Sequence, residues 1–110
     1  MNIKIEVNEQ DPLYEVKVHG EVDVYTAPKL REIVFPLSEK ESAEVVMDLS
    51  GVSYMDSTGL GVIVGVFKSC RAHHGELKLR GLSDRLKRLF EITGLADILK
   101  INSQIEGGVQ

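Results

Sequence analysis

The feature that most constrains the fold is a strand pattern that passes directly into a helix pattern in the middle of the chain. Residues 45–49 are almost continuously apolar, which is typical of a central strand covered on both faces. Apolar residues then recur with helical spacing at Leu60, Ile63, Val64 and Phe67. The turn between the two segments contains Gly59 and Gly61, which keep side chains away. A strand joined to a helix in this way predicts an α/β fold, with helices packed on a sheet.

Two alternating patterns near the N-terminus predict a hairpin. Residues 3–7 and 14–18 alternate apolar and polar side chains, as strands with one buried face do. The pair Asp11-Pro12 between them is typical of a turn. We therefore expect an antiparallel hairpin at one side of the sheet.

A first helix is predicted after this hairpin. Thr26 stands where a helix cap is expected, and Pro28 falls in the first turn, where its missing N–H costs nothing. The apolar face of this helix consists of Leu30, Ile33, Val34 and Leu37. Because proline removes a hydrogen bond from a helix interior, we expect Pro36 to bend or end the helix.

The C-terminal third adds one more strand and at least one more helix. Leu77 and Leu79 mark the strand, and Ser83 is expected to cap a helix that Gly94 closes. Residues 98–101 predict a last short strand or helix, and residues from about 103 to 110 a flexible tail. The order β-β-α-β-α-β-α therefore predicts one small α/β domain over residues 1–110, with a mixed sheet and helices packed against it.

Composition and charge exclude several classes of function. A net charge of −4 argues against nucleic acid as a partner, because binding phosphates needs clustered positive charge. No apolar stretch approaches the roughly 20 residues of a membrane span, and the N-terminus lacks the core of a signal peptide. The single Cys70 permits no internal disulfide. We therefore expect a cytoplasmic protein that binds neither membranes nor DNA directly.

One segment runs against the negative net charge. Between residues 78 and 88 the sequence gathers five basic side chains: Lys78, Arg80, Arg85, Lys87 and Arg88. The segment is interpreted either as a solvated face around the third helix or as a contact surface for an acidic protein patch. By contrast, core-like positions are predicted for Tyr54, Phe67, Cys70 and Phe90.

The turn Asp56-Ser57-Thr58-Gly59 holds the chemistry of most interest. A helix start gathers unpaired backbone N–H groups and the positive end of the peptide dipoles, so it favours an anion. Ser57 or Thr58 is well placed either to cap the helix or to carry a phosphate. A second acidic turn, residues 20–28, has the same strand-exit character. If the two preceding strands are parallel neighbours, both turns lie at the carboxyl edge of the sheet, where open α/β folds place their sites.

Enzymatic interpretations of this turn fail on spacing. It carries one residue too many for an aspartic-protease motif, and residues 59–61 lack the Gly-Lys-Ser/Thr ending of a phosphate-binding loop. A serine nucleophile needs a nearby general base. His73 and His74 fall at the far end of the helix that Ser57 begins, about 22 Å away at 1.5 Å rise per residue. Adjacent histidines on a helix diverge, so they do not predict a metal site either.

Two segments resemble the signatures of a known family. Residues 20–28 and 52–61 are similar to the signature segments of bacterial anti-sigma factor antagonists, which are single-domain proteins of the STAS fold. Residues 86–95 match the same family in type and position, and residues 106–110 resemble its general-stress branch. The resemblance spans nearly the whole chain and shows no departure at the acceptor motif. It implies that the helices pack mainly on one face of the sheet.

The resemblance implies a partner-switching function without catalysis or cofactor on this chain. Ser57, with Thr58 as second choice, would be phosphorylated by an anti-sigma factor that is itself a serine kinase. The unphosphorylated form would bind that partner and release the sigma factor, and a serine phosphatase would reverse the modification. The family motif also assigns Asp23, Tyr25, Asp56, Thr58 and Gly59 to the contact surface. The alternative function is a ligand- or anion-sensing STAS module of a larger sensory complex.

Overall fold

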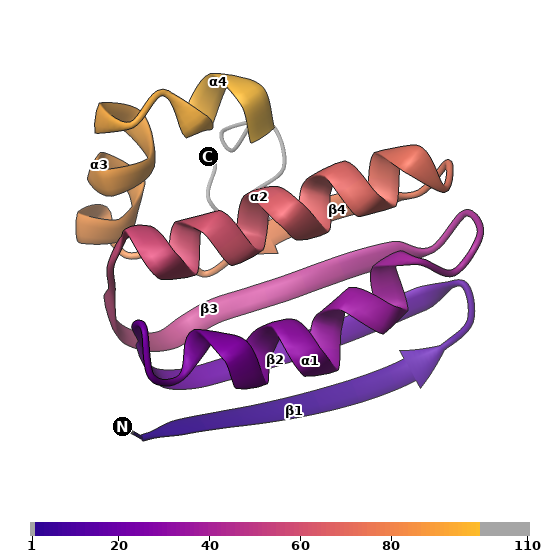
Figure 1. The fold of residues 1–110 in the computed structure, drawn as a ribbon, viewed down its shortest axis with the longest axis horizontal. Helices are drawn as coiled ribbons and strands as arrows, with labels where there is room; N and C mark the ends of the chain where they lie inside the picture. The colour runs from indigo at the N-terminus through magenta and orange to yellow at the C-terminus, as the bar shows by residue number, and fades with distance from the viewer. Residues whose placement is uncertain (1, 100–110) are drawn as a thin grey trace.

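The computed structural model describes residues 2–99 and shows the predicted α/β fold (Figure 1). The elements in chain order are β1 (Ile3–Gln10), β2 (Leu13–Val22), α1 (Ala27–Ser38), β3 (Glu44–Met55), α2 (Ser57–Ala72), β4 (Glu76–Arg80), α3 (Asp84–Ile92) and α4 (Leu95–Leu99). Of residues 98–101, where the sequence leaves strand and helix open, residues 98 and 99 belong to helix α4, and residues 100 and 101 lie outside the described residues. The predicted tail also lies outside them.

The four described strands form one mixed sheet in the order β1-β2-β3-β4. The β1–β2 pair is the predicted antiparallel hairpin, whereas β2, β3 and β4 run parallel. Val22 pairs with Met55 in the register of β2 and β3, so these strands end side by side. The loop after β2 and the turn after β3 therefore leave the sheet at the same carboxyl edge, as expected.

Helices α1 and α2 lie side by side over one face of the sheet (Figure 1). The core lies between them and the strands, because alternate residues of β2, β3 and β4 point toward the helices and are fully or almost fully buried: Val16, Val18, Val45, Met47, Leu49, Leu77 and Leu79. Leu30 and Val34 of α1 and Ile63 of α2 close the core from above. Burying each such side chain contributes about 1.5–3 kcal/mol to stability.

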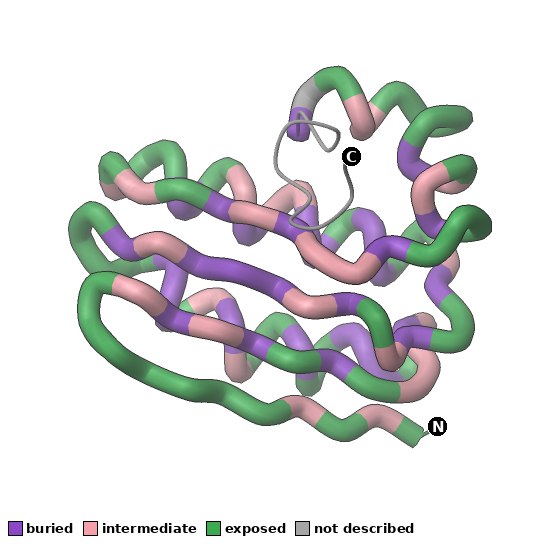
Figure 2. The backbone as a smooth tube through the Cα atoms, turned by 180° about the vertical axis from the view of Figure 1, so that it is seen from behind, coloured by how far each residue is buried: buried purple, intermediate pink, exposed green. Residues whose placement is uncertain are grey.

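Figure 2 shows the sheet from the face opposite the helices, where partly buried and exposed positions alternate with buried ones along β2, β3 and β4. Several of these partly buried positions on the strands are charged residues that form ion pairs. Lys78 Nζ lies 2.9 Å from Glu44 Oε2, and Arg80 Nη2 lies 3.1 Å from Glu15 Oε2. These pairs join β4 to β3 and to β2. Two of the five residues of the basic run are thus tied into the sheet, and the solvated face predicted around the third helix does not include Lys78 or Arg80.

The structure differs from two local predictions. Helix α1 continues past Pro36 to Ser38, so the proline lies in the last turn and does not end the helix. Tyr54 is 50% exposed, although its position in the pattern is core-like, whereas its neighbour Met55 is buried. Phe90 is fully buried and Phe67 is half-buried. Burial raises the pKa of the Cys70 thiol to about 11, as suits a small core residue.

Candidate functional site at the carboxyl edge of the sheet

Asp56 caps helix α2, in place of the predicted Ser57 or Thr58. Its backbone is extended, as a cap residue requires, and its Oδ1 accepts hydrogen bonds from the N–H groups of Thr58 (2.9 Å) and Gly59 (3.4 Å). An aspartate also suits this position because its charge lies at the positive end of the helix dipole. The carboxylate therefore satisfies the helix start and leaves both neighbouring hydroxyl groups available.

Ser57 is the first residue of α2 and is exposed. Within residues 2–99 its hydroxyl group makes no hydrogen bond. Thr58 is exposed as well, but its N–H is held by Asp56. The turn thus presents an unengaged serine hydroxyl to solvent at a helix start, where the backbone N–H groups and the helix dipole favour an anion.

Gly59 is buried and brings the start of α2 against the ends of two strands. A Cβ atom at this position would lie 2.7 Å from Cγ of Met55 and 2.7 Å from Cγ1 of Val22. Gly61, by contrast, has no neighbour within 4 Å. Of the two turn glycines, Gly59 is therefore the one that packing requires. It is buried beneath the turn, where it lets the helix approach the strands, and it offers little surface to a partner.

The loop between β2 and α1 is held by Asp23 and Thr26. Asp23 Oδ1 accepts hydrogen bonds from the N–H groups of Tyr25 (2.9 Å) and Thr26 (3.1 Å). Partial burial raises the pKa of Asp23, but the hydrogen bonds from Tyr25 and Thr26 outweigh it and hold the pKa below its ordinary value. The Thr26 hydroxyl accepts from the Asp23 N–H (2.9 Å) and donates to the Glu21 carbonyl (2.7 Å). Thr26 thus occupies the predicted cap position of α1. Its side chain, however, makes no capping hydrogen bond to the helix, contrary to the prediction.

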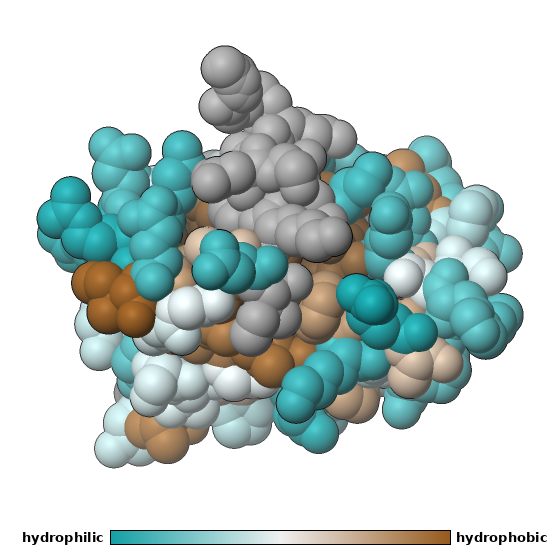
Figure 3. All heavy atoms as spheres, turned by 90° about the horizontal axis from the view of Figure 1, so that it is seen from above, coloured by the Kyte–Doolittle hydropathy of each residue, from teal (hydrophilic) through white to brown (hydrophobic). Residues whose placement is uncertain are grey.

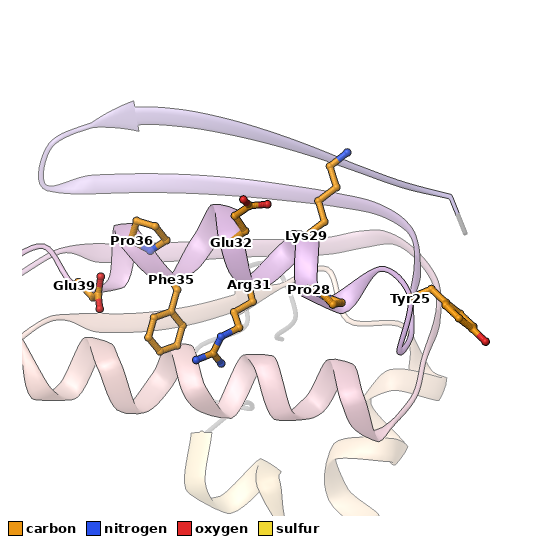
Figure 4. Close-up of a pocket in the computed structure, with 8 residues that line it drawn as sticks. All are labelled: Tyr25, Pro28, Lys29, Arg31, Glu32, Phe35, Pro36 and Glu39. Atoms are coloured by element: carbon orange, nitrogen blue, oxygen red, sulfur yellow. The ribbon is translucent and has the colours of Figure 1, made fainter.

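This loop exposes two large apolar side chains. Tyr25 is 76% exposed and Val24 is 57% exposed, and Figure 4 shows Tyr25 pointing away from the end of α1. Sequence reasoning assigned Tyr25 to the contact surface but missed Val24. Its signal is an apolar residue inside a turn, between an aspartate and an aromatic residue. Exposed apolar side chains that the loop holds in place are suited to contact a partner protein.

The two loops form one surface, which we call the acceptor edge: residues 23–26 and residues 56–59. They are tied together where the Asp56 N–H donates to the Val22 carbonyl at 3.2 Å. The acceptor edge brings together Asp23, Tyr25, Asp56, Ser57 and Thr58, with Gly59 buried beneath them. All six residues predicted from the sequence therefore converge.

Other candidate sites do not offer comparable chemistry. His73 and His74 follow α2 at the end opposite Ser57. Among residues 2–99 there is no group of three or more histidine, cysteine or acidic residues placed to hold a metal ion. In the same range, no helix has both the length and the apolar character needed to cross a membrane.

A shallow hollow of about 840 Å³ runs along α1 from Tyr25 (Figure 4). Arg31 stacks on Phe35 there, with 4.4 Å between the guanidinium carbon and the ring centre. The hollow is open to solvent, and its charged lining contains both signs: Lys29, Arg31, Glu32 and Glu39. It therefore shows no selectivity for a ligand of either charge.

Comparisons with known proteins agree with this geometry. The anti-sigma-B factor antagonist of Bacillus subtilis is 53% identical over 110 residues and covers 100% of both chains. An anti-sigma factor antagonist from Mycobacterium paratuberculosis superposes with a TM-score of 0.79 and 26% identity, over 91% of this chain and 85% of that one. The phosphorylated form of a Bacillus cell fate determinant has the same fold, with a TM-score of 0.74 and 16% identity, over 97% and 93% of the two chains. The STAS domain model matches residues 4–107, and the chain belongs to the STAS domain family.

Proposed function

We propose that this protein is an anti-sigma factor antagonist whose acceptor edge binds an anti-sigma factor when Ser57 is unmodified. Binding occupies the anti-sigma factor and releases the sigma factor for transcription. Phosphorylation of Ser57 ends the interaction. The full-length identity of 53% to the anti-sigma-B factor antagonist of Bacillus subtilis supports the class of partner.

The observation that carries the proposal is the unengaged hydroxyl group of Ser57. Asp56 provides the helix cap, so the hydroxyl group of Ser57 contributes no hydrogen bond to the described fold and is exposed within the acceptor edge. Serine at a helix start is most often a cap that stabilises by about 1 kcal/mol. Here that role belongs to its neighbour, which leaves the serine available as an acceptor.

The switch follows from the charge of a phosphoserine. A phosphate adds roughly −1.5 to −2 charges at pH 7. The helix start favours this anion by about 0.3–1 kcal/mol, whereas the nearby carboxylates of Asp56 and Asp23 oppose it. These local terms are small, so the fold survives modification. Burying the unpaired dianion in an interface costs several kcal/mol, and a loss of about 4 kcal/mol weakens binding about a thousandfold.

Catalysis and nucleotide belong to other proteins in this scheme. The anti-sigma factor acts as the serine kinase, and a separate serine phosphatase restores the unmodified form. This chain then needs no cofactor and makes no direct contact with nucleic acid. The scheme places the protein in the cytoplasm, with its partner. Ser57 is favoured over Thr58 because only Ser57 is free of the cap at both its hydroxyl and its backbone N–H.

Incubation with the purified cognate anti-sigma factor and ATP tests the proposal. Mass spectrometry should find one added phosphoryl group on Ser57 in the wild type and none on Ser57→Ala, which should still bind the partner. A phosphate on the alanine variant would move the acceptor to Thr58. Binding of a small anion, with no phosphoryl transfer under any of these conditions, would instead favour the sensing module.

A further inference from the structure

The α3 groove, between the end of β3 and helix α3, lies next to the acceptor edge. Residues 52–55 of β3 form one wall, and Arg85, Arg88, Leu89 and Ile92 of α3 belong to the other. Its volume is about 300 Å³, at the small end of ligand pockets, so it suits a side chain or a short segment. Because β3 passes from this wall to Asp56 and Ser57 within three residues, the groove and the acceptor edge form one continuous surface.

The charge of the groove is opposite to that of the chain as a whole. Its lining contains Arg85 and Arg88 and no acidic residue, although the net charge of the protein is −4. Both arginines are exposed, and neither forms an ion pair within the described part of the chain. The two residues stand three apart on α3 and therefore project on the same side of the helix. Unlike Lys78 and Arg80, Arg85 and Arg88 form no ion pair within the described fold.

The groove also exposes apolar surface. Ile92 is 74% exposed and Tyr54 is 50% exposed, and both line the same groove as the two arginines. In Figure 3, apolar atoms reach the surface at the α3 end of the molecule among strongly polar ones. Tyrosine and arginine are among the residues that protein interfaces concentrate at their strongest contacts, and the groove presents Tyr54 together with Arg85 and Arg88.

We propose that the α3 groove is a second docking site for the anti-sigma factor, and that it takes an acidic segment bearing one apolar side chain. The proposal rests on the function proposed above and adds a contact that phosphorylation does not touch. Arg85 and Arg88 pair with carboxylates of the segment, and its apolar side chain packs between Tyr54 and Ile92. The arginines steer the encounter and select the partner, while Ser57 decides whether the complex persists.

Charge reversal on purified protein tests this proposal. The double variant Arg85→Glu/Arg88→Glu should bind the purified anti-sigma factor at least about tenfold more weakly in titration calorimetry, and its affinity should depend less on salt. The control Lys68→Glu/Arg71→Glu changes the net charge equally on exposed residues of distal α2 and should bind within about twofold of wild type. Circular dichroism should show all variants folded, since each altered side chain is exposed.

The apolar half of the groove has its own variant. Ile92→Ser removes an exposed side chain, so the fold should persist while the affinity falls about fivefold. Replacing an acidic residue of the partner by lysine should restore binding to the double glutamate variant.

Three results would overturn the inference in distinguishable ways. If the double glutamate variant binds like wild type while Ser57→Asp does not bind, the groove is not a docking site, and the proposed function stands. If Ser57→Asp and wild type bind equally, the proposed function fails and this inference fails with it. If sedimentation shows that wild type self-associates and the double variant does not, the groove takes a second copy of this chain instead.

Discussion

The two loops of the acceptor edge use the same hydrogen-bond device with opposite results. In Asp23-Val24-Tyr25-Thr26 and in Asp56-Ser57-Thr58-Gly59, the aspartate Oδ1 accepts from the N–H groups two and three residues later. In the first loop the fourth residue is Thr26, whose buried hydroxyl closes the loop by binding Asp23 and Glu21. In the second it is Gly59, which packs on Val22 and Met55 and leaves the hydroxyl groups unused.

The difference suits the first loop to presenting side chains and the second loop to being modified. In the first loop the Thr26 hydroxyl group is engaged in hydrogen bonds that hold the loop rigid, and the side chains of Val24 and Tyr25 are exposed. This loop is therefore suited to permanent contacts. The second keeps its hydroxyl free and obtains its rigidity from the aspartate cap and a close-packed glycine, so its chemistry can change without unfolding the turn. One carboxylate geometry thus supports the proposed fixed contact and the proposed switch side by side.

The largest effect is expected from a charge placed at Ser57. Ser57→Asp should weaken binding to the anti-sigma factor by about a thousandfold, because the interface then buries an unpaired charge. Its thermal stability should change little, because an acidic residue at a helix start is favourable by about 0.3–1 kcal/mol. Titration calorimetry and thermal melting measure the two quantities. Loss of binding together with a large drop in melting temperature would mean that the second loop is structural after all.

The next largest effect is expected from the two glycines of the turn. Gly59→Ala should destabilise the fold by about 1–3 kcal/mol, since the added Cβ meets Met55 and Val22 at 2.7 Å. Gly61→Ala is the matched control, and it should stabilise by about 0.4–1 kcal/mol because the site is open and helical. Urea unfolding of both variants checks the pair. Equal effects would show that packing does not distinguish the two positions.

A smaller effect should separate the two threonines. Thr26→Val keeps the shape of the side chain but removes a buried hydroxyl with hydrogen bonds at 2.9 and 2.7 Å, at a cost of about 1.5 kcal/mol. Thr58→Val, at an exposed position, should change stability by no more than about 0.5 kcal/mol. Amide hydrogen exchange should also show faster opening of residues 23–26 in the first variant alone. Comparable losses of stability in Thr26→Val and Thr58→Val would mean that the two loops do not differ in how they use their threonine hydroxyl groups.

The smallest effect concerns acid. The pKa of Asp23 is lowered in the folded protein, so its ionised form contributes stability above the unfolded pKa of about 3.9. That contribution is lost as the pH falls through the lower, folded pKa. Asp23→Asn should therefore flatten the dependence of melting temperature on pH below about pH 4. If the melting temperature of Asp23→Asn depends on pH below about 4 as that of wild type does, the hydrogen bonds to Asp23 do not stabilise its ionised form over its protonated form.

Periodicity and motif were enough to predict most of this molecule. The hairpin, the central strand and three helices were predicted, because apolar spacing reports directly which face of an element is buried. The parallel pairing of β2 and β3, which gathers the site, was a condition of the prediction, and the structure supplies it. The family follows from the same segments. That Ser57 is the acceptor remains a prediction, but the exposed hydroxyl at the helix start is where the motif placed it.

Only the tertiary structure decided how neighbouring polar groups share their hydrogen bonds. Asp56, Ser57 and Thr58 are all competent caps in sequence, and the extended backbone of Asp56 at the end of β3 selects it. In the same way, the close approach of β2, β3 and β4 draws Lys78 and Arg80 into pairs and leaves Arg85 and Arg88 unused. A sequence pattern specifies which residues face the core, whereas hydrogen-bond and ion-pair partners depend on distances that exist only after the strands have assembled.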